Sequence, residues 1–494
     1  MIRATISVVD ALSLFATLPD WLTALSVADA LSLFATLPDW LMALADSAAV
    51  LTVVSRRVPE FASGELELRE CKVERVRLRG GAVTALYRLT YADRAAGHKR
   101  VVEVLGETVS PGAAEPSPGT NGVPFGTDGW RCYLPELRLD LGLAPPDLRL
   151  PALSTLMDAE RSREFLERAI RAGSPAYANL RILAARPRIV RAKGNRCTVR
   201  YELEYPPEDA DSPSPVIAKT YRRDAGAKTY AGMRALWSSA LGTRGAVAVA
   251  EPLAYDPELK VLLQGPVRGE STLTDLIRSA FASGSTEALG EVSAYVDKTA
   301  LGLAALHTSG VTYGKTITWA DRVADIEEQL GWVTPLAPEL SDAALPLLTR
   351  LVKREAEHPP DPLVPTHGSF RPNQVLLSGG EIGVVDFDGF CQAEPAVDVA
   401  CFLASLKKTV RVHADDEGAG RRDIGRARLS EEELGERFLQ QYGAIANISR
   451  ERVVLWEALE FFNGVLDCWT KMSVGLDARV ELLRHHLRMI GLAA

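Results

Sequence analysis

Two short polar segments, each next to an apolar stretch, constrain this chain more than any other feature. Residues 366–377 read THGSFRPNQVLL and residues 384–389 read VVDFDG. The glycine pair at 379–380 predicts a hairpin turn between the two apolar stretches, so the polar residues of both segments can converge. Amide and carboxylate oxygens are ligands that hold Mg²⁺ against nucleotide phosphates. The two segments therefore predict a site for phosphoryl transfer.

These segments resemble the catalytic and metal-binding loops of the aminoglycoside phosphotransferase-like kinases, whose first loop usually reads His-Gly-Asp-x-x-x-x-Asn or Gln. On that pattern His367 matches the loop histidine and Gln374 falls on a metal-ligand position. Asp386 matches the Mg²⁺-binding aspartate, and Asp388 matches the acidic residue after it. The resemblance implies ATP and Mg²⁺ as cofactors. Gln374, together with a β-rich N-terminal region, is most similar to the bacterial maltokinase branch.

Ser369 stands where the family carries the aspartate that accepts the proton of the substrate hydroxyl. A serine has no useful basicity, and loss of a general base typically costs ~10²–10⁴ in rate. Because the transition state is loose, the proton can leave late, to Asp388 or to solvent. The expected catalytic residues are therefore Ser369, Asp388 and His367, with His367 in a structural role. Asp398, in the family motif PAVDVA, is expected to brace this loop.

Lys219 follows the apolar residues 216–218, where a charged head is costly unless it is paired or points into a cleft. Taken alone it also fits an edge residue whose head reaches solvent. In the resemblance it contacts the α- and β-phosphates. The family's glutamate on the next helix is missing around residues 230–234, so we expect Lys219 to pair with Asp386 when nucleotide is absent.

Two further segments are expected to contact the nucleotide. The loop at residues 191–196 would cover the phosphates with the charges of Arg191, Lys193 and Arg196, although it also fits an exposed hairpin tip. Residues 261–267, VLLQGPV, read as a buried strand and a hinge. Backbone groups from Gln264 to Val267 would bond the adenine edge there.

The N-terminal region holds an almost identical tandem repeat with a 19-residue period. Residues 10–25 read DALSLFATLPDWLTAL and residues 29–44 read DALSLFATLPDWLMAL. Each copy offers an Asp N-cap and an apolar run, which predicts short paired helices. Three interpretations remain: a helical cap packed on the following domain, a docking or self-association tail, and, weakest, an anchor on anionic membrane.

The pattern predicts an α+β, bilobal protein-kinase-like fold with an extra β-rich cap and a helical N-tail. The expected domains are a repeat tail at 1–47, a β-rich cap at 48–169, a small lobe at 170–265 and a helical large lobe at 266–494. Hairpins are expected near residues 71–91 and 189–205, which share a Tyr-x-Leu-x-Tyr pattern, and a linker or long loop at 110–129. The cap and the small lobe thus read as two related three-stranded units.

Composition limits the partners of this 494-residue chain. A formal net charge of −8 argues against nucleic-acid binding. Six scattered cysteines favour a reducing cytoplasm over a disulfide framework or a metal cluster. The longest apolar runs predict no transmembrane segment, and Asp10 interrupts the core of any secretion signal.

Two functions remain open. The first is an ATP- and Mg²⁺-dependent kinase, slowed by Ser369, whose acceptor is a hydroxyl of a sugar, an aminoglycoside-like molecule or a peptide Ser/Thr. The second is a pseudokinase that uses a nucleotide site, if any, to set its conformation and recruits a partner through residues 10–44. Ser369 and the missing helix glutamate favour the second; Lys219, Gln374 and Asp386 favour the first.

Overall fold

The computed structural model describes residues 31–32, 34, 37–93, 98–109, 114–144, 150–193, 196–222, 224–239, 241, 247–269, 271–415, 430–473 and 475–492. These residues form two compact units. The first unit contains the described residues up to Ala144 together with Val323–Glu357 and Phe461–Ala494, and the second contains Pro145–Arg322 and His358–Glu460. The first copy of the tandem repeat, residues 10–25, lies outside the described residues.

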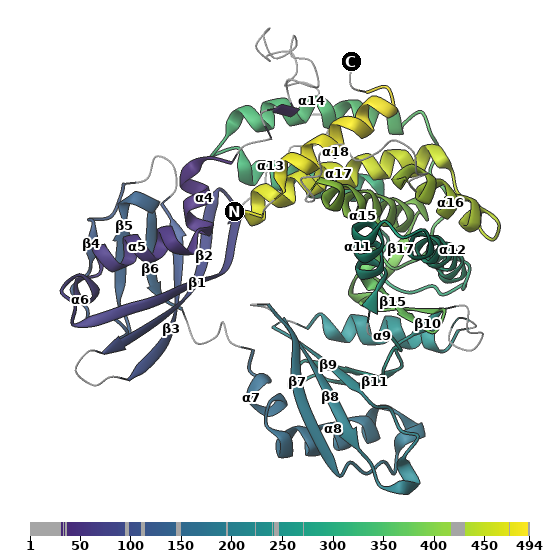
Figure 1. Cartoon of the computed structure of the whole chain (residues 1–494), viewed down its shortest axis with the longest axis horizontal. Coiled ribbons are helices and arrows are strands. Elements are labelled where there is room, and N and C mark those ends of the chain that lie inside the picture. The colour runs from purple at the N-terminus through teal and green to yellow at the C-terminus, as the bar shows by residue number, and fades with distance from the viewer. Residues whose placement is uncertain are drawn as a thin grey trace. The chain divides into compact units, whose positions relative to one another are not determined.

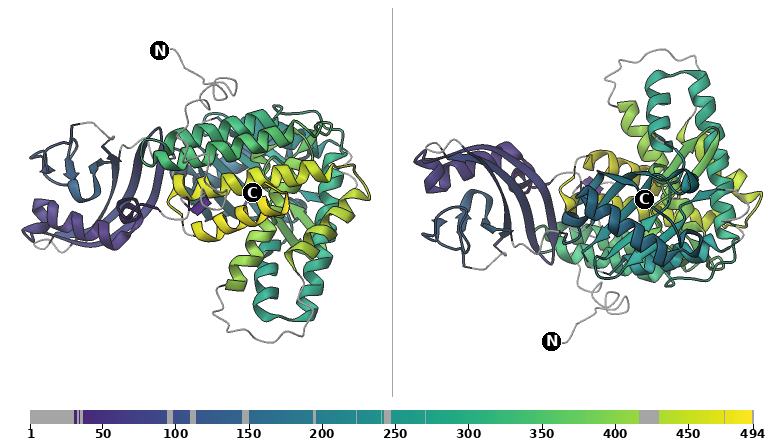
Figure 2. Two further views of the ribbon diagram at one scale, coloured as in Figure 1. Left: turned by 90° about the horizontal axis from the view of Figure 1, so that it is seen from above. Right: turned by 90° about the horizontal axis from the view of Figure 1, so that it is seen from below.

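The first unit is built on a six-stranded antiparallel sheet in the order β1-β2-β3-β6-β5-β4 (Figures 1 and 2). Its elements are α4 (Asp39–Ala45), α5 (Ser47–Arg57), α6 (Pro59–Ala62), β1 (Leu66–Arg79), β2 (Ala82–Asp93), β3 (Lys99–Thr108), β4 (Gly119–Thr120), β5 (Arg131–Leu134), the 3-10 helix η2 (Pro135–Leu137), β6 (Leu139–Leu143), α14 (Pro338–Glu355) and α18 (Leu476–Met489). The helices α13 (Trp319–Val333) and α17 (Arg450–Lys471) belong to it in part.

The predicted hairpin of the first unit is present as β1 and β2. Gly80 and Gly81 join the strands with φ of 60° and 79°, a left-handed conformation that glycine adopts without strain. Helix α5 buries Val50, Val53 and Val54, so the sheet and the helix share one core. The segment expected as a linker or long loop, 110–129, contains the two-residue strand β4, which pairs with β5 after the segment ends.

The second unit begins with a small lobe around the sheet β11-β12-β9-β8-β7. Its elements are α7 (Leu153–Leu156), α8 (Ala159–Gly173), η4 (Pro175–Tyr177), β7 (Ala184–Lys193), β8 (Arg196–Glu204), η5 (Pro207–Asp209), β9 (Val216–Tyr221), α9 (Gly226–Trp237), β10 (Ala248–Val249), β11 (Pro252–Asp256) and β12 (Val261–Gln264). Leu156, Phe165 and Ile170 pack into the core of this sheet, so the helices α7 and α8 belong to the second unit.

The large lobe of the second unit carries the two motif loops on short strands between helices (Figure 1). Its elements are β13 (Ser271–Thr272), α11 (Leu273–Ser283), α12 (Thr286–His307), β14 (Val364–Thr366), η6 (Pro372–Gln374), β15 (Val375–Ser378), β16 (Glu381–Val384), η7 (Phe387–Gly389), β17 (Cys391–Ala393), α15 (Ala396–Asp415) and α16 (Glu431–Gly443). The predicted capping box of Ser430 and Glu433 starts α16. A sheet lobe joined at Gln264 to a helical lobe is the expected bilobal kinase-like fold, with the extra β-rich region in the first unit.

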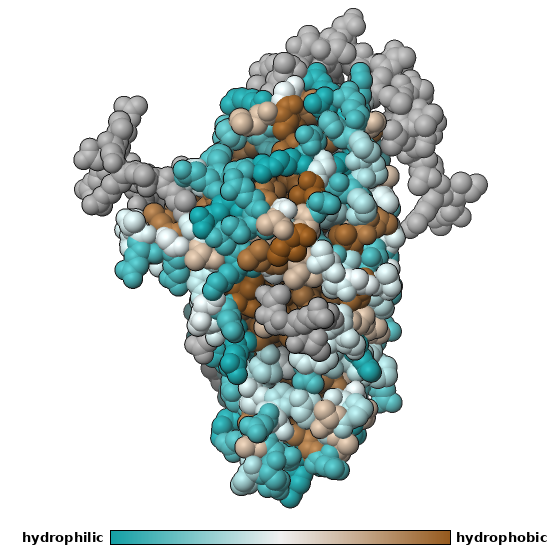
Figure 3. Space-filling view, turned by 90° about the vertical axis from the view of Figure 1, so that its right-hand side faces the viewer, coloured by the Kyte–Doolittle hydropathy of each residue, from teal (hydrophilic) through white to brown (hydrophobic). Residues whose placement is uncertain are grey.

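Surface polarity and helix composition complete the description. In the face shown in Figure 3, hydrophilic residues cover most of the lower end, where the small lobe lies, and hydrophobic residues are interspersed above it. Within the described ranges, no helix combines the length and the apolar character needed to cross a membrane. All six cysteines are buried, and no disulfide joins any of them.

Candidate active site

The two motif loops lie against each other because short strands pair on both sides of them. β14 pairs with β17, which places Thr366 opposite Cys391, and β15 pairs with β16, which places Val375 opposite Val384. Gly368 has φ of 78°, and a Cβ on it would lie 2.2 Å from the carbonyl oxygen of Gly389. Only glycine fits this approach, so the catalytic loop and the metal loop are in backbone contact.

Asp398, in the first turn of α15, binds the backbone of the catalytic loop. Its fully buried carboxylate accepts hydrogen bonds from the backbone N–H groups of His367 at 2.5 Å and Gly368 at 2.8 Å. His307 contributes a third contact through Nε2 at 3.2 Å. Burial alone would raise the pKa of Asp398, but the hydrogen bonds and charges of His307 and His367 outweigh it and lower the pKa. The expected bracing role fits this geometry.

His367 links the two loops and is not exposed to solvent. It is fully buried, and its Nε2 lies 3.0 Å from the carbonyl oxygen of Val385, so this nitrogen donates. Burial lowers the pKa of His367, which favours the neutral ring. The ring also packs on Phe387 with centroids 4.7 Å apart. His367 is therefore a positioning residue that fixes the backbone just before Asp386.

The metal loop and the small lobe meet in a cluster of opposite charges. Lys219 Nζ donates to Asp386 Oδ1 at 2.7 Å and to Asp388 Oδ1 at 3.3 Å, as the missing helix glutamate led us to expect for Asp386. Arg196 Nη1 donates to Asp388 Oδ2 at 2.5 Å, and the Tyr221 hydroxyl donates to Asp388 Oδ1 at 3.0 Å. Asp388 thus receives three donors, all from the small lobe.

Asp386 has a strained backbone conformation and an ionised side chain. Burial would raise its pKa, but Lys219 and Arg196 lower it to about 2, so the group is a carboxylate at neutral pH. Its φ of 74° places it in the left-handed region, which non-glycine residues adopt rarely. Such strain is common where a side chain must be aimed at a ligand.

Gln374 completes the set of metal-ligand candidates. Its side chain is 9% exposed, and its Oε1 is buried without a hydrogen-bond partner among the described residues. Its backbone oxygen accepts from Val385 N at 3.0 Å, so it lies next to the residue that precedes Asp386. A buried amide oxygen without a donor, on a residue whose backbone bonds the residue before Asp386, suits a hard cation such as Mg²⁺. The residues present therefore fit the metal that the family implies.

Ser369 lies beside the metal loop, half-buried, as the third residue of the catalytic loop. A Cβ built on Gly389 would lie 3.6 Å from Ser369 Oγ, which places the hydroxyl against the residue after Asp388. Arg322 on α13 donates to the neighbouring Gly368 carbonyl oxygen at 3.4 Å. The catalytic-loop position thus carries a neutral hydroxyl with a guanidinium nearby.

The predicted nucleotide contacts are distributed over the small lobe. Gln264 ends β12 and is buried, and Val267 packs on β16, since a Cβ on Gly383 would lie 2.1 Å from its Cγ1. Arg191 is exposed on β7, opposite Thr198. Lys193 ends β7 opposite Arg196, but its side chain is not among those described. The structure therefore gathers Lys219, Asp386 and Asp388 in one cluster and leaves Arg191 on the surface.

Two contacts of this cluster were not predicted, because Tyr221 is not among the expected site residues and Arg196 is expected over the phosphates and not on Asp388. Tyr221 lies two residues after Lys219 on β9, and Arg196 pairs directly with Tyr221 on β8. Side chains two apart on a strand, and directly opposite across strands, share a face of the sheet. The alternation of β9 therefore contained the signal for Tyr221, and its pairing with β8 contained the signal for Arg196.

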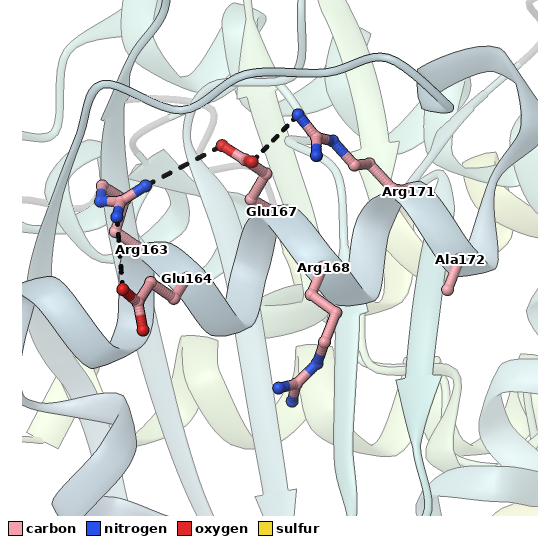
Figure 4. A pocket seen from close by; sticks show the side chains of 6 residues that line it. All are labelled: Arg163, Glu164, Glu167, Arg168, Arg171 and Ala172. Carbon is pink, nitrogen blue, oxygen red and sulfur yellow. Dashed lines mark ion pairs between the residues drawn. The ribbon is translucent and has the colours of Figure 1, made fainter.

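A shallow surface pocket on α8 is separate from this cluster. Its lining is Arg163, Glu164, Glu167, Arg168, Arg171 and Ala172 (Figure 4). Ion pairs along the helix join Glu167 to Arg171 at 2.9 Å and to Arg163 at 4.0 Å. All six residues come from the outer side of the single helix α8, so this pocket is a groove between side chains of one helix.

In the second unit, a lysine in the third strand of a sheet lobe faces two carboxylates from a loop of a helical lobe. Residues 207–448 match the sequence model of the phosphotransferase enzyme family. The resemblance to aminoglycoside phosphotransferase-like kinases is therefore confirmed. No curated protein matches the chain. The maltokinase branch stays a prediction.

Solved structures similar to the chain are distant. The streptomycin–ATP complex of the aminoglycoside phosphotransferase APH(2″)-IIa is 14% identical, with a TM-score of 0.41 over 60% of this chain and 92% of that one. Choline kinase LicA from Streptococcus pneumoniae is 14% identical, with a TM-score of 0.42 over 66% and 99%. A glucosamine kinase with glucosamine, ADP and phosphate is 19% identical, with a TM-score of 0.42 over 62% and 79%.

Proposed function

We propose that this chain transfers the γ-phosphoryl group of ATP to a hydroxyl of a small molecule, of the sugar or aminoglycoside class, at a slow rate. The proposal rests on the contact of Lys219 with Asp386 at 2.7 Å and on the buried Gln374 Oε1, which has no hydrogen-bond partner among the described residues. One cation for phosphates and two oxygen ligands for a metal are the minimum that phosphoryl transfer needs from a protein.

The residues of the cluster divide the work of binding. Asp386 and Gln374 would hold Mg²⁺, which supplies neutralisation of charge on the phosphates. Lys219 would leave Asp386 and contact the phosphates. Arg196, at the start of β8, lies close enough to Asp388 to exchange that carboxylate for a phosphate oxygen as well. A guanidinium suits this role because its fork of donors matches phosphate oxygens.

The slow rate follows because no free carboxylate is positioned on the catalytic loop to accept the proton of the substrate hydroxyl. Ser369 supplies a hydroxyl in place of the family's base. From the sequence, Asp388 is expected to accept the substrate proton in place of the missing base. In the structure, however, Arg196, Lys219 and Tyr221 all donate to Asp388. Transfer then depends on late loss of the proton from the acceptor, which costs ~10²–10⁴ in rate relative to a positioned base.

A pseudokinase is the second candidate, and the same charges favour it. The sequence of α9, GAKTYAGMRALW, contains no acid, so Lys219 has no partner on that helix to hold it away from Asp386. In this alternative nucleotide binding sets the conformation of the unit without turnover. A peptide Ser/Thr acceptor remains a further option for the enzyme, because acceptor-binding helices carry no diagnostic motif.

Thermal-shift measurements with ATP and Mg²⁺ test both candidates. We expect stabilisation of the wild-type chain and none for Asp386→Asn. No shift for the wild type at saturating nucleotide would exclude both candidates. Mass spectrometry of sugar, aminoglycoside and peptide acceptors after incubation then separates enzyme from pseudokinase.

The variant Ser369→Asp sharpens that separation. A gain in turnover of ~10²-fold or more would identify the missing base as the cause of a slow enzyme. Unchanged, undetectable turnover in both proteins, with nucleotide binding intact, would favour the pseudokinase. Ser369→Ala is the matched control, because it removes the hydroxyl without adding a charge.

A further inference from the structure

The second copy of the tandem repeat is part of the core of the first unit. Four of its described apolar side chains are almost completely buried: Leu31 0%, Phe34 1%, Leu41 0% and Leu44 0% exposed. The Phe34 ring meets Phe462 edge-on with centroids 6.2 Å apart. Trp469 Nε1 donates to the carbonyl oxygen of Phe34 at 3.2 Å. This copy is therefore a seated segment of the unit.

Two more contacts hold the other half of this copy. The buried hydroxyl of Tyr87 donates to the carbonyl oxygen of Leu44 at 2.9 Å. The guanidinium of Arg138 lies over the Trp40 ring, 6.0 Å from its centroid. We call the surface formed by Tyr87, Arg138, Phe462 and Trp469 the repeat groove. Two of its four contacts go to backbone oxygens, which any sequence with the same backbone path would present.

The first copy carries the same residue at every position that the repeat groove contacts. Leu12, Phe15, Trp21, Leu22 and Leu25 correspond to Leu31, Phe34, Trp40, Leu41 and Leu44. The one difference between the copies is Thr23 in place of Met42. Met42 is 45% exposed, among the most exposed large hydrophobic side chains of the unit. The position that differs is thus one that the unit leaves in solvent, and the contacts cannot distinguish the copies.

We propose that the repeat groove is a binding site for either copy, and that residues 10–25 of the same chain occupy it whenever residues 29–44 cannot. The seated copy continues directly into Asp46, the N-cap of α5. Seating the first copy instead leaves a 19-residue segment as a loop between two adjacent ends. Closing such a loop lowers the population of this register on the order of 10²-fold.

The tether also decides between occupants. A copy joined through about twenty residues is present at an effective concentration in the millimolar range, far above that of a second chain in dilute solution. The first copy of the same chain is therefore the expected substitute, and a second molecule is the less favourable one. The inference concerns the first unit alone and does not depend on the proposed phosphotransferase activity.

Matched substitutions in the two copies test this in the full-length chain. Phe15→Asp should leave the Tm unchanged, because the second copy is seated. Phe34→Asp should lower the Tm modestly, because the first copy takes its place at the cost of the loop. The double variant should lose far more than the sum of the two, since no intact copy remains. Additive effects, with Phe34→Asp as harmful as the double variant, would overturn the proposal.

A milder series and a peptide keep the test decisive if the double variant does not fold. The Phe15→Ala, Phe34→Ala and double variants should show the same non-additivity with smaller losses. A synthetic peptide of residues 10–25 should raise the Tm of the double alanine variant, and the same peptide with Phe15→Asp should not. Rescue of Phe34→Asp that grows with protein concentration would contradict the assignment to the same chain and point to a second copy of the protein.

Discussion

The sheet of the first unit and the sheet of the small lobe follow the same plan, although only one of them holds a cluster of the kind that binds nucleotide. The first runs β1-β2-β3-β6-β5 before β4, and the second runs β7-β8-β9-β12-β11. In both sheets, the third strand in chain order pairs antiparallel with the strand that comes last in the chain, β3 with β6 and β9 with β12. The predicted relationship between two three-stranded units therefore extends to five strands.

The likeness continues into the helices that precede each sheet. Asp46 caps α5 and Asp158 caps α8, each through its side chain. The Tyr87 hydroxyl donates to the carbonyl oxygen of Leu44, which lies just before the capped helix of its own unit. The Tyr201 hydroxyl donates to that of Leu156 in the same way, at 2.6 Å. The shared Tyr-x-Leu-x-Tyr pattern thus marks a shared anchor between sheet and helix.

The difference between the sheets is concentrated at one register position. Lys219 lies opposite Thr198, and its counterpart Glu107 lies opposite Thr84. The small lobe then inserts α9 after its third strand, whereas the described part of residues 109–130 contains β4 and no helix. The comparison teaches that this scaffold folds with either charge at this position, and it predicts that only the sheet with the lysine binds an anion.

The largest effect is expected from Lys219→Met. It removes the ammonium group that would contact the phosphates, and removal of one such charged donor typically costs ~10²–10³ in rate. The thermal shift with ATP and Mg²⁺ should disappear at the same time. The matched control is Glu107→Gln, which changes the equivalent position of the other sheet. A nucleotide response that survives Lys219→Met would break the comparison.

A pH titration of nucleotide-free stability comes next in size. The pKa of Asp386 is about 2 in the folded chain, below its ordinary value of 3.8. A lowered carboxyl pKa stabilises the fold above about pH 4, and this stabilisation is lost as the pH falls from about 4 to about 2. It amounts to about 2 kcal/mol at most. Urea unfolding of Asp386→Asn should show a flatter dependence in that window; an unchanged slope would contradict the ion pair.

Removing the two anchoring hydroxyls should have effects of the same order, similar to each other in the two units. Tyr87→Phe and Tyr201→Phe each leave a buried carbonyl oxygen without its donor, which costs ~1–3 kcal/mol. Denaturant midpoints of the two variants report the loss. Because the anchors are equivalent, the two losses should agree within a factor of two or three. A loss of stability for one variant alone would show that the two hydrogen bonds contribute differently to the two units.

The smallest effect is expected for Glu107→Lys, which copies the charge of the small lobe into the other sheet. Glu107 is exposed, and exposed substitutions usually change stability by less than ~0.5 kcal/mol. We expect no second nucleotide site, since this sheet has no partner carboxylates equivalent to Asp386 and Asp388 among its described contacts. Isothermal titration with ATP and Mg²⁺ should give the stoichiometry of the wild type, and an added binding event would refute this.

Local patterns in the sequence predicted much of this architecture. Alternation and the glycine pairs located the hairpins, and the motif loops located Asp386, Gln374 and Asp398. The contact of Arg196 with Asp388 spans 192 residues, and no local pattern reports such a distance. The grouping of α14 and α18 with the first sheet is equally non-local. The roles of Ser369, Gln374 and Asp386 in chemistry stay predictions.

The pairing of Lys219 with Asp386 bears on the order in which ligands arrive. In the ion pair, the charges of Lys219 and Asp386 neutralise each other, so the pair attracts neither a cation nor an anion strongly. A metal alone would strand the ammonium, and a nucleotide alone would strand the carboxylate. We expect this ion pair to separate only when the metal and the nucleotide bind together as one complex. The affinity for nucleotide should therefore increase with the concentration of free Mg²⁺.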